Sequence, residues 1–397
     1  MKTATHYNAI VIGLGAMGSA TLYQLSEKQK PGSTLLGLEQ FTIPNSFSSH
    51  HSKTRLTRLT APECEDYYKI ALRSAQLWTE IEEKVKAKFG KLWRKTGGLI
   101  LGDSEQKDSF LEASIQSAQK NHLAHKILKA EEIAAAFPQL KTSSNTIAYY
   151  EEAMGLLSPE ACLLSQLELA KENGAEIHFQ EKLLHFEKEA SGKIILQTDK
   201  GLYSTDNLIL TTGAWMAELL DPSYADFFKI YRQVSFRFKI EESMNADYSI
   251  THFPPMLYIS NTNTIFYAFP DEANAVKVGC ENLVHTSSIQ NINRNATPEE
   301  EQLHYQHFVE PYFKGITNEC LYTEICLYTC TPDHLFLIDY LPNFEKNVII
   351  ASACSGRGFK HSAAIGEALA NQILNLTNDL DLIALFGFKG TNRHAAL

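Results

Sequence analysis

The sequence predicts an α/β protein of two domains, in which α/β segments at both ends enclose a β-rich middle. At 397 residues the chain exceeds the usual size of a single core, which is about 100 to 200 residues. The first forty residues follow the order strand, glycine turn, helix, strand, which is typical of a βαβ unit. Because no repeat or low-complexity linker separates the middle from the ends, the two domains should be discontinuous in the sequence.

The N-terminal βαβ unit is indicated by its apolar runs. Residues 9–12 form a continuous apolar run suited to a parallel strand that is buried on both faces. Gly13 ends this strand, and a helix should follow over residues 16–28. A second strand is expected over residues 33–38, ending at Glu39.

Later elements follow from periodicity. Apolar residues recur at helical spacing over residues 67–88. Residues 275–278 alternate in character and predict a strand with two unlike faces. The remaining expected elements are strands over residues 207–215, 231–239 and 348–351, a tight loop over residues 355–358 and a helix over residues 363–374.

Composition excludes several classes of protein. Hydrophobic residues at 44% and charged residues at 21% argue against disorder, and a formal charge of -10 disfavours nonspecific binding to nucleic acid. Seven scattered cysteines without CxxC spacing predict neither a disulfide framework nor a metal site. With no signal-peptide core and no apolar run long enough to span a membrane, we expect a cytoplasmic protein without a membrane partner.

Gly13, Gly15 and Gly18 fit the pattern GxGxxG between the first strand and the helix. Such glycines permit a tight turn and close approach to a pyrophosphate, and the helix N-terminus favours its negative charge. Glu39 lies 21 residues past Gly18, where an acid can bind ribose hydroxyls. These residues predict a dinucleotide site, although the motif alone does not separate NAD from FAD.

Residues 48–58, SSHHSKTRLTR, concentrate five basic or imidazole groups in an otherwise acidic chain. Arg55 and Arg58 are three residues apart, so a helical turn would put both guanidinium groups on one face, suited to binding a carboxylate. A solvated basic turn is the alternative interpretation.

Further segments occur in a fixed order along nearly the whole chain. Besides the glycine motif and the SxHxxTRxxR of residues 49–58, they are residues 72–78 (LRSAQLW), 213–215 (GAW), 231–234 (YRQV), 326–329 (CLYT) and 355–360 (SGRGFK). In this combination the chain resembles the monomeric sarcosine oxidase and N-methyltryptophan oxidase family of FAD-dependent amine oxidases.

The resemblance implies a domain division and a set of partners. A Rossmann-like FAD-binding domain would take residues 1–90, 145–220 and 322–397. A substrate-binding domain with a mixed or antiparallel sheet would take residues 91–144 and 221–321, and the active site should lie between the two. The expected protein is a monomer that acts on a small amino acid and O2.

The resemblance also assigns the residues that hold FAD. Cys326 would be joined through a thioether to the flavin 8α-methyl group, whereas a buried free thiol is the default for a cysteine without context. His51 and Arg55 match residues close to the flavin ring. The expected cofactor-binding set is Gly13, Gly15, Gly18, Glu39, Thr54, Cys326, Gly356, Gly358 and Lys360.

Lys277 matches the lysine that helps O2 accept electrons from reduced flavin, because an enclosed cation stabilises developing superoxide. A lysine on the wet face of a strand is the alternative. With Lys277, we expect Arg55 and His51 to serve catalysis. Residues expected to contact the substrate are Arg58 and Lys360, which match the pair that holds its carboxylate, together with Tyr267, Tyr328 and Glu281.

Two positions depart from the family pattern. Glu281 stands where relatives carry a histidine that lines the substrate site, and Arg357 replaces the usual histidine between the two glycines of the C-terminal loop. A carboxylate could bind a second amino group of the substrate or repel an anionic side chain. Alternatively, Glu281 points to solvent.

The reaction implied is oxidation of an N-methyl or cyclic amino acid to an imine, which water hydrolyses, with O2 reduced to hydrogen peroxide. A flavin dehydrogenase or a pipecolate-like cyclic imino-acid oxidase on the same scaffold is the nearest alternative. More distant alternatives are an NAD-dependent dehydrogenase and a non-catalytic nucleotide-binding module.

Overall fold

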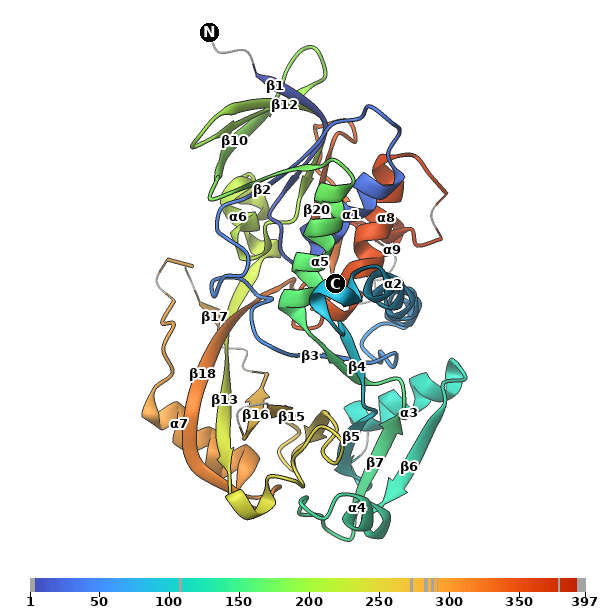
Figure 1. Ribbon diagram of the computed structural model, residues 1–397, viewed down its shortest axis with the longest axis vertical. Helices are drawn as coiled ribbons and strands as arrows, with labels where there is room; N and C mark the ends of the chain where they lie inside the picture. Colours follow the sequence, from blue (N-terminus) through green and yellow to red (C-terminus); the bar gives the residue numbers. More distant parts are fainter. Residues whose placement is uncertain are drawn as a thin grey trace.

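The computed structural model describes two large sheets joined by a small one. It covers residues 4–106, 109–271, 274–281, 285–286, 289–290, 292–377 and 379–390. Figure 1 shows the two large sheets at opposite ends of an elongated molecule, with the long strands β13 and β18 reaching from one end towards the other.

An eight-stranded sheet forms the end that contains both the start and the last strands of the chain (Figure 1). Its strands are β1 (Thr5–Ile12), β2 (Leu35–Glu39), β9 (Glu176–Phe179), β10 (Leu183–Lys188), β11 (Ile194–Thr198), β12 (Leu202–Leu210), β19 (Leu337–Tyr340) and β20 (Val348–Ser352). The strands β9, β2, β1, β12 and β20 are adjacent in this order and all parallel. This is the Rossmann-like arrangement that the first forty residues predicted.

Helices beside this sheet come from distant parts of the chain. They are α1 (Ala16–Lys28), α2 (Glu65–Phe89), α5 (Pro159–Glu172), α8 (Ser362–Ile373) and α9 (Leu382–Phe386), and the short α6 (Met216–Leu219) follows β12. The predicted helices over residues 16–28, 67–88 and 363–374 are confirmed to within two residues at each end.

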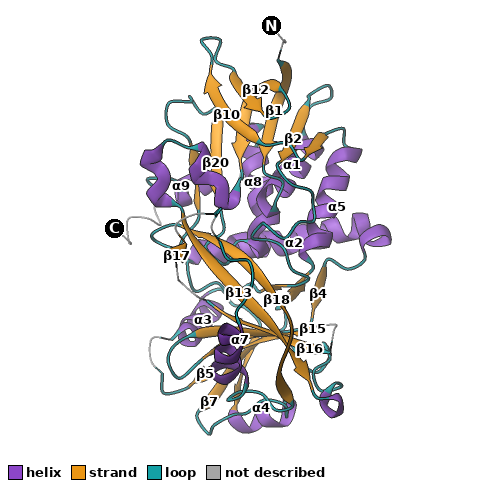
Figure 2. Cartoon of the chain, turned by 90° about the vertical axis from the view of Figure 1, so that its left-hand side faces the viewer, coloured by secondary structure: helices purple, strands orange, loops and turns teal. Residues whose placement is uncertain are grey.

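A nine-stranded sheet forms the other end of the molecule. Its strands are β5 (Gly98–Asp103), β6 (His125–Lys129), β7 (Thr146–Glu151), β13 (Lys229–Ile240), β14 (Met256–Ile259), β15 (Ile265–Asp271), β16 (Ala275–Cys280), β17 (His285–Thr286) and β18 (Ile316–Cys330). Only the β5–β14 pair among these described strands is parallel, so the sheet is mixed, as expected. Figure 2 shows α3 (Phe110–Lys120), α4 (Ala130–Ala136) and α7 (Pro298–His304) around it.

The small sheet lies between the two large ones and consists of β3 (Arg55–Thr57), β8 (Gly155–Leu157) and β4 (Trp93–Lys95). The proposed FAD-binding domain includes residues 145–220 and 322–397. However, β7 and most of β18, which fall within these ranges, belong to the nine-stranded sheet. The residue limits of the two domains therefore stay a proposal.

The apolar run at the N-terminus is buried on both faces, as its sequence predicted. Val11 packs in the core shared with the helices, whereas Ile10 and Ile12 pack in a second core on the opposite face of the sheet. All three side chains are at most 5% exposed. Burying a side chain of this kind stabilises the fold by about 1.5 to 3 kcal/mol.

One local prediction was wrong, and one alternative is ruled out. Arg55 does not begin a helical turn but a strand, because Arg55 and Thr57 pair antiparallel with β8. Lys277 does not lie on a wet face of its strand, which was the alternative interpretation: it is 2% exposed, since β16 is hydrogen-bonded between β13 and β15 inside the sheet. In both cases strand pairing decided a feature that local sequence left open.

Candidate active site

A cavity of about 660 Å³ extends between the two large sheets and gathers most of the predicted site residues. Its lining includes Gly13, Gly15, Glu39, Arg55, Arg58, Tyr267, Lys277, Glu281, Cys326, Tyr328, Gly356, Gly358 and Lys360. Three predicted residues, Gly18, His51 and Thr54, do not line this cavity.

The glycine motif builds one end of the cavity. Gly13 has a φ of +85°, and its N–H donates to the Leu38 carbonyl at 2.8 Å, which turns the chain from β1 into α1. At Gly18 a Cβ would lie 1.9 Å from the Gly13 carbonyl oxygen, so only glycine allows this close packing of helix on turn. Gly15, Ala16 and Met17 at the N-terminus of this helix line the cavity, and such a terminus favours an anion.

Glu39 closes the same end, at the last residue of β2. Its carboxylate accepts hydrogen bonds from the N–H groups of Leu14, at 2.8 Å, and Phe41, at 3.0 Å. Burial raises the pKa of Glu39, and these two donors partly oppose that rise. The carboxylate is thereby fixed at the edge of the cavity where a ribose hydroxyl could donate to it.

Arg55 ties the loop before β3 to Cys326 on β18. Its guanidinium donates to the carbonyls of Ser49, at 2.9 Å, and His51, at 2.7 Å, and to Cys326 Sγ at 3.4 Å. The Cys326 thiol is buried and reaches the His51 carbonyl at 3.8 Å. His51 itself is anchored by a 2.8 Å contact between Nδ1 and the Ser48 carbonyl, and burial lowers its pKa.

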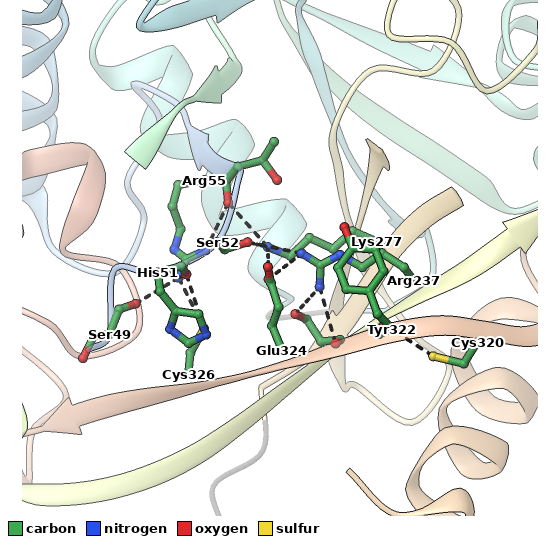
Figure 3. Close-up of polar contacts among 12 residues, drawn as sticks. Ser49, His51, Ser52, Arg55, Arg237, Lys277, Cys320, Tyr322, Glu324 and Cys326 are labelled. Atoms are coloured by element: carbon green, nitrogen blue, oxygen red, sulfur yellow. Dashed lines mark hydrogen bonds and ion pairs between the residues drawn. The ribbon is translucent and has the colours of Figure 1, made fainter. Parts of the chain in front are cut away.

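Lys277 belongs to a second buried group of charges, which we call the Lys277 cluster: Ser52, Arg237, Lys277 and Glu324 (Figure 3). Lys277 Nζ donates to Ser52 Oγ at 2.7 Å and lies 3.4 Å from the Thr54 carbonyl. Burial, and then the cations nearby, lower the pKa of Lys277 well below its usual value. Two neighbouring strands of the nine-stranded sheet, β13 and β18, and the loop before β3 thus surround this lysine at the cavity wall.

The two residues expected to bind a carboxylate, Arg58 and Lys360, lie with Glu63 and Arg357 in a group that we call the Arg58 cluster. Arg58 is buried and donates to Glu63 at 2.6 Å, and Arg357 lies 3.8 Å from the same carboxylate. Burial raises the pKa of Glu63, but Arg58, Lys360 and Arg357 outweigh it and bring the pKa to about 2. Glu63 therefore faces three cationic side chains, and the carboxylates of Glu151 and Glu281 also act on Lys360 and Arg357.

Lys360 is the cation of this cluster that titrates most easily. Burial, together with the neighbouring Arg58, lowers its pKa to about 7, and Glu63 opposes the shift. Its ammonium should therefore gain strongly from an additional anion.

Two tyrosines and one acid complete the wall. Tyr267 on β15 and Tyr328 on β18 both line the cavity, and burial raises their pKa values far enough to keep the phenols neutral. Glu281, at the end of β16, lines the cavity but is exposed. The two interpretations of Glu281 from the sequence are thus compatible, since it faces both the cavity and solvent.

Glu63, Arg237 and Glu324 were missed by sequence reasoning. Glu63 is part of no motif. The strand that contains Arg237 was predicted over residues 231–239, but the complete burial of this arginine was not. Glu324 had a usable signal, because it lies two residues before Cys326 on a strand and so on the same face.

Comparison with known proteins identifies the family. Residues 8–372 match the family model described as FAD dependent oxidoreductase (DAO). The chain belongs to this family and is an FAD-dependent oxidoreductase.

The relatives agree with the resemblance seen in the sequence. The monomeric sarcosine oxidase of Bacillus sp. (strain B-0618) is 32% identical over 96% of this chain and 95% of that protein. The N-methyl-L-tryptophan oxidase of Yersinia pestis (strain Pestoides F) is 28% identical over 95% of this chain and 98% of that protein.

Solved structures show the same fold at lower identity. The open form of NikD, described as an unusual amino acid oxidase essential for nikkomycin biosynthesis, is 19% identical with a TM-score of 0.83 over 96% of this chain and 98% of that one. L-proline dehydrogenase from P. horikoshii is 19% identical with a TM-score of 0.78 over 97% of both chains. The predicted fold class is confirmed.

The residues present fit FAD. A Cβ at Gly15 would lie 3.1 Å from His50 Nδ1 at the cavity wall. Because glycine has no side chain, a pyrophosphate could approach the backbone at this helix N-terminus. Glu39 lies at the end of β2, where an acid can accept from a ribose hydroxyl, and the same cavity is lined by Cys326 and Lys277.

Among the residues that the structure describes, no helix is long and apolar enough to cross a membrane. In the same part of the chain, no group of three or more metal-ligating side chains is brought together.

Proposed function

We propose that this protein oxidises the C–N bond of a small secondary amino acid, N-methylated or cyclic, to an imine. Water then hydrolyses the imine to an aldehyde and an amine, and O2 is reduced to hydrogen peroxide. The observation that carries this proposal is the Arg58 cluster, which brings the cationic side chains of Arg58, Arg357 and Lys360 into the same cavity as the dinucleotide motif. The relatives named above act on amino acids of this kind, as their names state.

The carboxylate of the substrate would bind between Arg58 and Lys360. An arginine fork and an ammonium point charge are suited to this task. Because Glu63 already accepts from Arg58, the incoming carboxylate would share or replace that contact. Tyr267 and Tyr328 would enclose the alkyl part of the substrate and exclude water.

When bound, FAD supplies a two-electron acceptor for the amine and passes the electrons to O2. Gly13, Gly15, Gly18 and Glu39 would hold its dinucleotide part. Lys277 would place a positive charge where O2 acquires electrons, in an enclosed site where this attraction is strong.

Cys326 would anchor the cofactor through a thioether between Sγ and the flavin 8α carbon. Its thiol is buried at the cavity wall, beside the Arg55 guanidinium. We also propose that the protein works as a monomer, as the name of its relative suggests.

The decisive experiment begins with an absorbance spectrum of the purified protein and acid precipitation. Yellow colour that stays with the pellet, and is released in Cys326→Ala, is the expected result for a covalent flavin. Colour in the supernatant would retain the oxidase and cancel the linkage. Peroxide formation is then measured with a panel of N-methyl and cyclic amino acids in air. A colourless protein with no amine-dependent peroxide would refute the proposed function, and turnover only with an artificial acceptor would favour the dehydrogenase.

A further inference from the structure

Glu324 is an acid that the proposed chemistry does not use, yet it lies beside the lysine on which that chemistry depends. It stands on β18, two residues before Cys326, with a side chain 17% exposed. Together with His51 and Ser52, it lines a second cavity of about 280 Å³ that Lys277 does not line. Glu324 therefore lines the second cavity and not the large one that Lys277 lines.

The contacts around Glu324 are those of a buried counter-ion. Its carboxylate pairs with Arg237, whose side chain is fully buried. The same carboxylate lies 3.9 Å from Lys277 Nζ. Ser52 Oγ joins the two cations, because it accepts from Lys277 at 2.7 Å and from Arg237 at 3.2 Å. Figure 3 shows these side chains converging from β13, β16, β18 and the loop before β3.

Other charged or titratable groups also face Lys277. Arg55, from β3, adds a second cation, and His51 and Cys326 complete the surroundings. The Phe269 ring, from β15, lies 5.8 Å from Lys277 Nζ. Among these described neighbours, Glu324 is the carboxylate that contacts Lys277.

The electrostatic balance explains why such a carboxylate is needed. Burial, Arg237 and Arg55 each lower the pKa of Lys277, and Glu324 acts in the opposite direction. Burial raises the pKa of Glu324, but Arg237 and Lys277 outweigh it and bring this pKa to about 2. Glu324 is therefore ionised at all working pH values, whereas the charge of Lys277 depends on its neighbours.

We propose that Glu324 is the counter-ion that keeps Lys277 in its charged form and in place for the reduction of O2. Glu324 is thus a positioning residue, which acts through Lys277 and does not touch substrate. This inference rests on the role of Lys277 in the proposed function. Arg237 has the opposite influence, because it shares the same carboxylate and repels the lysine.

The test measures the titration of Lys277 directly. The protein, with its flavin, is labelled with [¹³Cε]lysine, and the Lys277 signal is assigned by its loss in Lys277→Met. Its midpoint is then followed by NMR in the wild type and in Glu324→Gln. We expect a midpoint lower by about 1 to 3 pH units in the variant, since a carboxylate within 4 to 6 Å favours the charged amine by that much.

Matched variants separate charge from structure. Glu319→Gln removes an exposed acid of the same strand, which pairs with Lys239 at 2.8 Å, and should leave the midpoint unchanged. Glu324→Asp keeps the charge and should restore most of the shift. If Glu324→Gln does not fold, Arg237→Met gives an independent reading, because the lysine should then titrate at a higher pH than in the wild type.

A second readout links the charge to O2. In stopped-flow experiments the rate of flavin reoxidation by O2 should fall as pH rises through the Lys277 midpoint. In Glu324→Gln this fall should occur at a lower pH. Anaerobic reduction by substrate should be unaltered. An unchanged NMR midpoint in Glu324→Gln overturns the inference. Normal reoxidation in Lys277→Met would instead overturn the role of the lysine, whatever the NMR shows about its counter-ion.

Discussion

The Arg58 cluster and the Lys277 cluster solve the same physical problem in different ways. Each buries one carboxylate among cations, and Glu63 and Glu324 both have a pKa of about 2. In the Arg58 cluster the carboxylate is five residues from its arginine, whereas Arg237 and Glu324 come from two different strands. Unpaired charge in a low dielectric is costly, so both clusters need their acid.

The two clusters differ in which cavity their carboxylate lines. Glu63 faces three cationic side chains at the wall of the large cavity. Glu324 instead lines the second cavity and not the large one. In the proposed function, the first cluster would receive a carboxylate and the second would hold a fixed charge.

The largest effect should come from Lys277→Met, which removes that fixed charge. We expect reoxidation by O2 to slow by about 100-fold or more, because one preorganised electrostatic group is lost at the developing negative charge. Anaerobic reduction by substrate should change far less, and stopped-flow absorbance measures both half-reactions. Lys239→Met, an exposed lysine on the neighbouring strand β13, is the control. Equal slowing of both half-reactions would remove the contrast between the clusters.

Arg58→Met tests the receiving cluster. We expect KM for an amino-acid substrate to rise by about 30-fold or more, since losing one partner of a buried charge pair costs about 2 kcal/mol or more. Steady-state peroxide assays measure this, with Arg73→Met as a control on a partly exposed ion pair. If Arg58→Met instead slowed reoxidation by O2 without raising KM, the two clusters would not have the separate roles proposed for them.

The pH dependence of carboxylate binding sharpens the role of Lys360. Its pKa of about 7 means that it is charged below this pH and neutral above it. Binding of propionate, which has no amine, should therefore weaken by up to about 10-fold as pH rises through 7, as one opposite charge within reach is lost. Titration of the flavin absorbance measures the Kd. Lys360→Met should bind weakly at every pH, and a wild type with no pH dependence would show that Lys360 does not contact the carboxylate.

The smallest effect is expected at Glu281, because an exposed charge is screened by solvent. Glu281→Gln should reduce the preference for an N-methyl amino acid with a second amino group, over a neutral one of equal length, by about 2- to 5-fold. Ratios of kcat/KM for the two substrates measure this preference. An unaltered ratio would mean that Glu281 only faces solvent and that the substrate is selected elsewhere.

Much of the fold could be predicted because its signals are local. The glycine turn, the apolar run of residues 9–12 and the helices over residues 16–28 and 67–88 depend on backbone freedom and on periodicity within one segment. Residues that line the large cavity were predicted where a motif carried them, as at Arg58, Lys277 and Cys326, and their roles stay a prediction. Glu63 and Arg237 were missed, because nothing in their own segments marks them as buried partners.

By itself, therefore, the sequence determined the family, the dinucleotide end of the cavity and the identity of the cationic residues. The tertiary structure alone decided that Arg55 starts a strand, that Lys277 is buried and that Glu324 lies 3.9 Å from it. The physical reason is that the protonation and reach of a charged side chain depend on burial and on neighbours from distant segments. Those neighbours exist only once β13, β16 and β18 have paired.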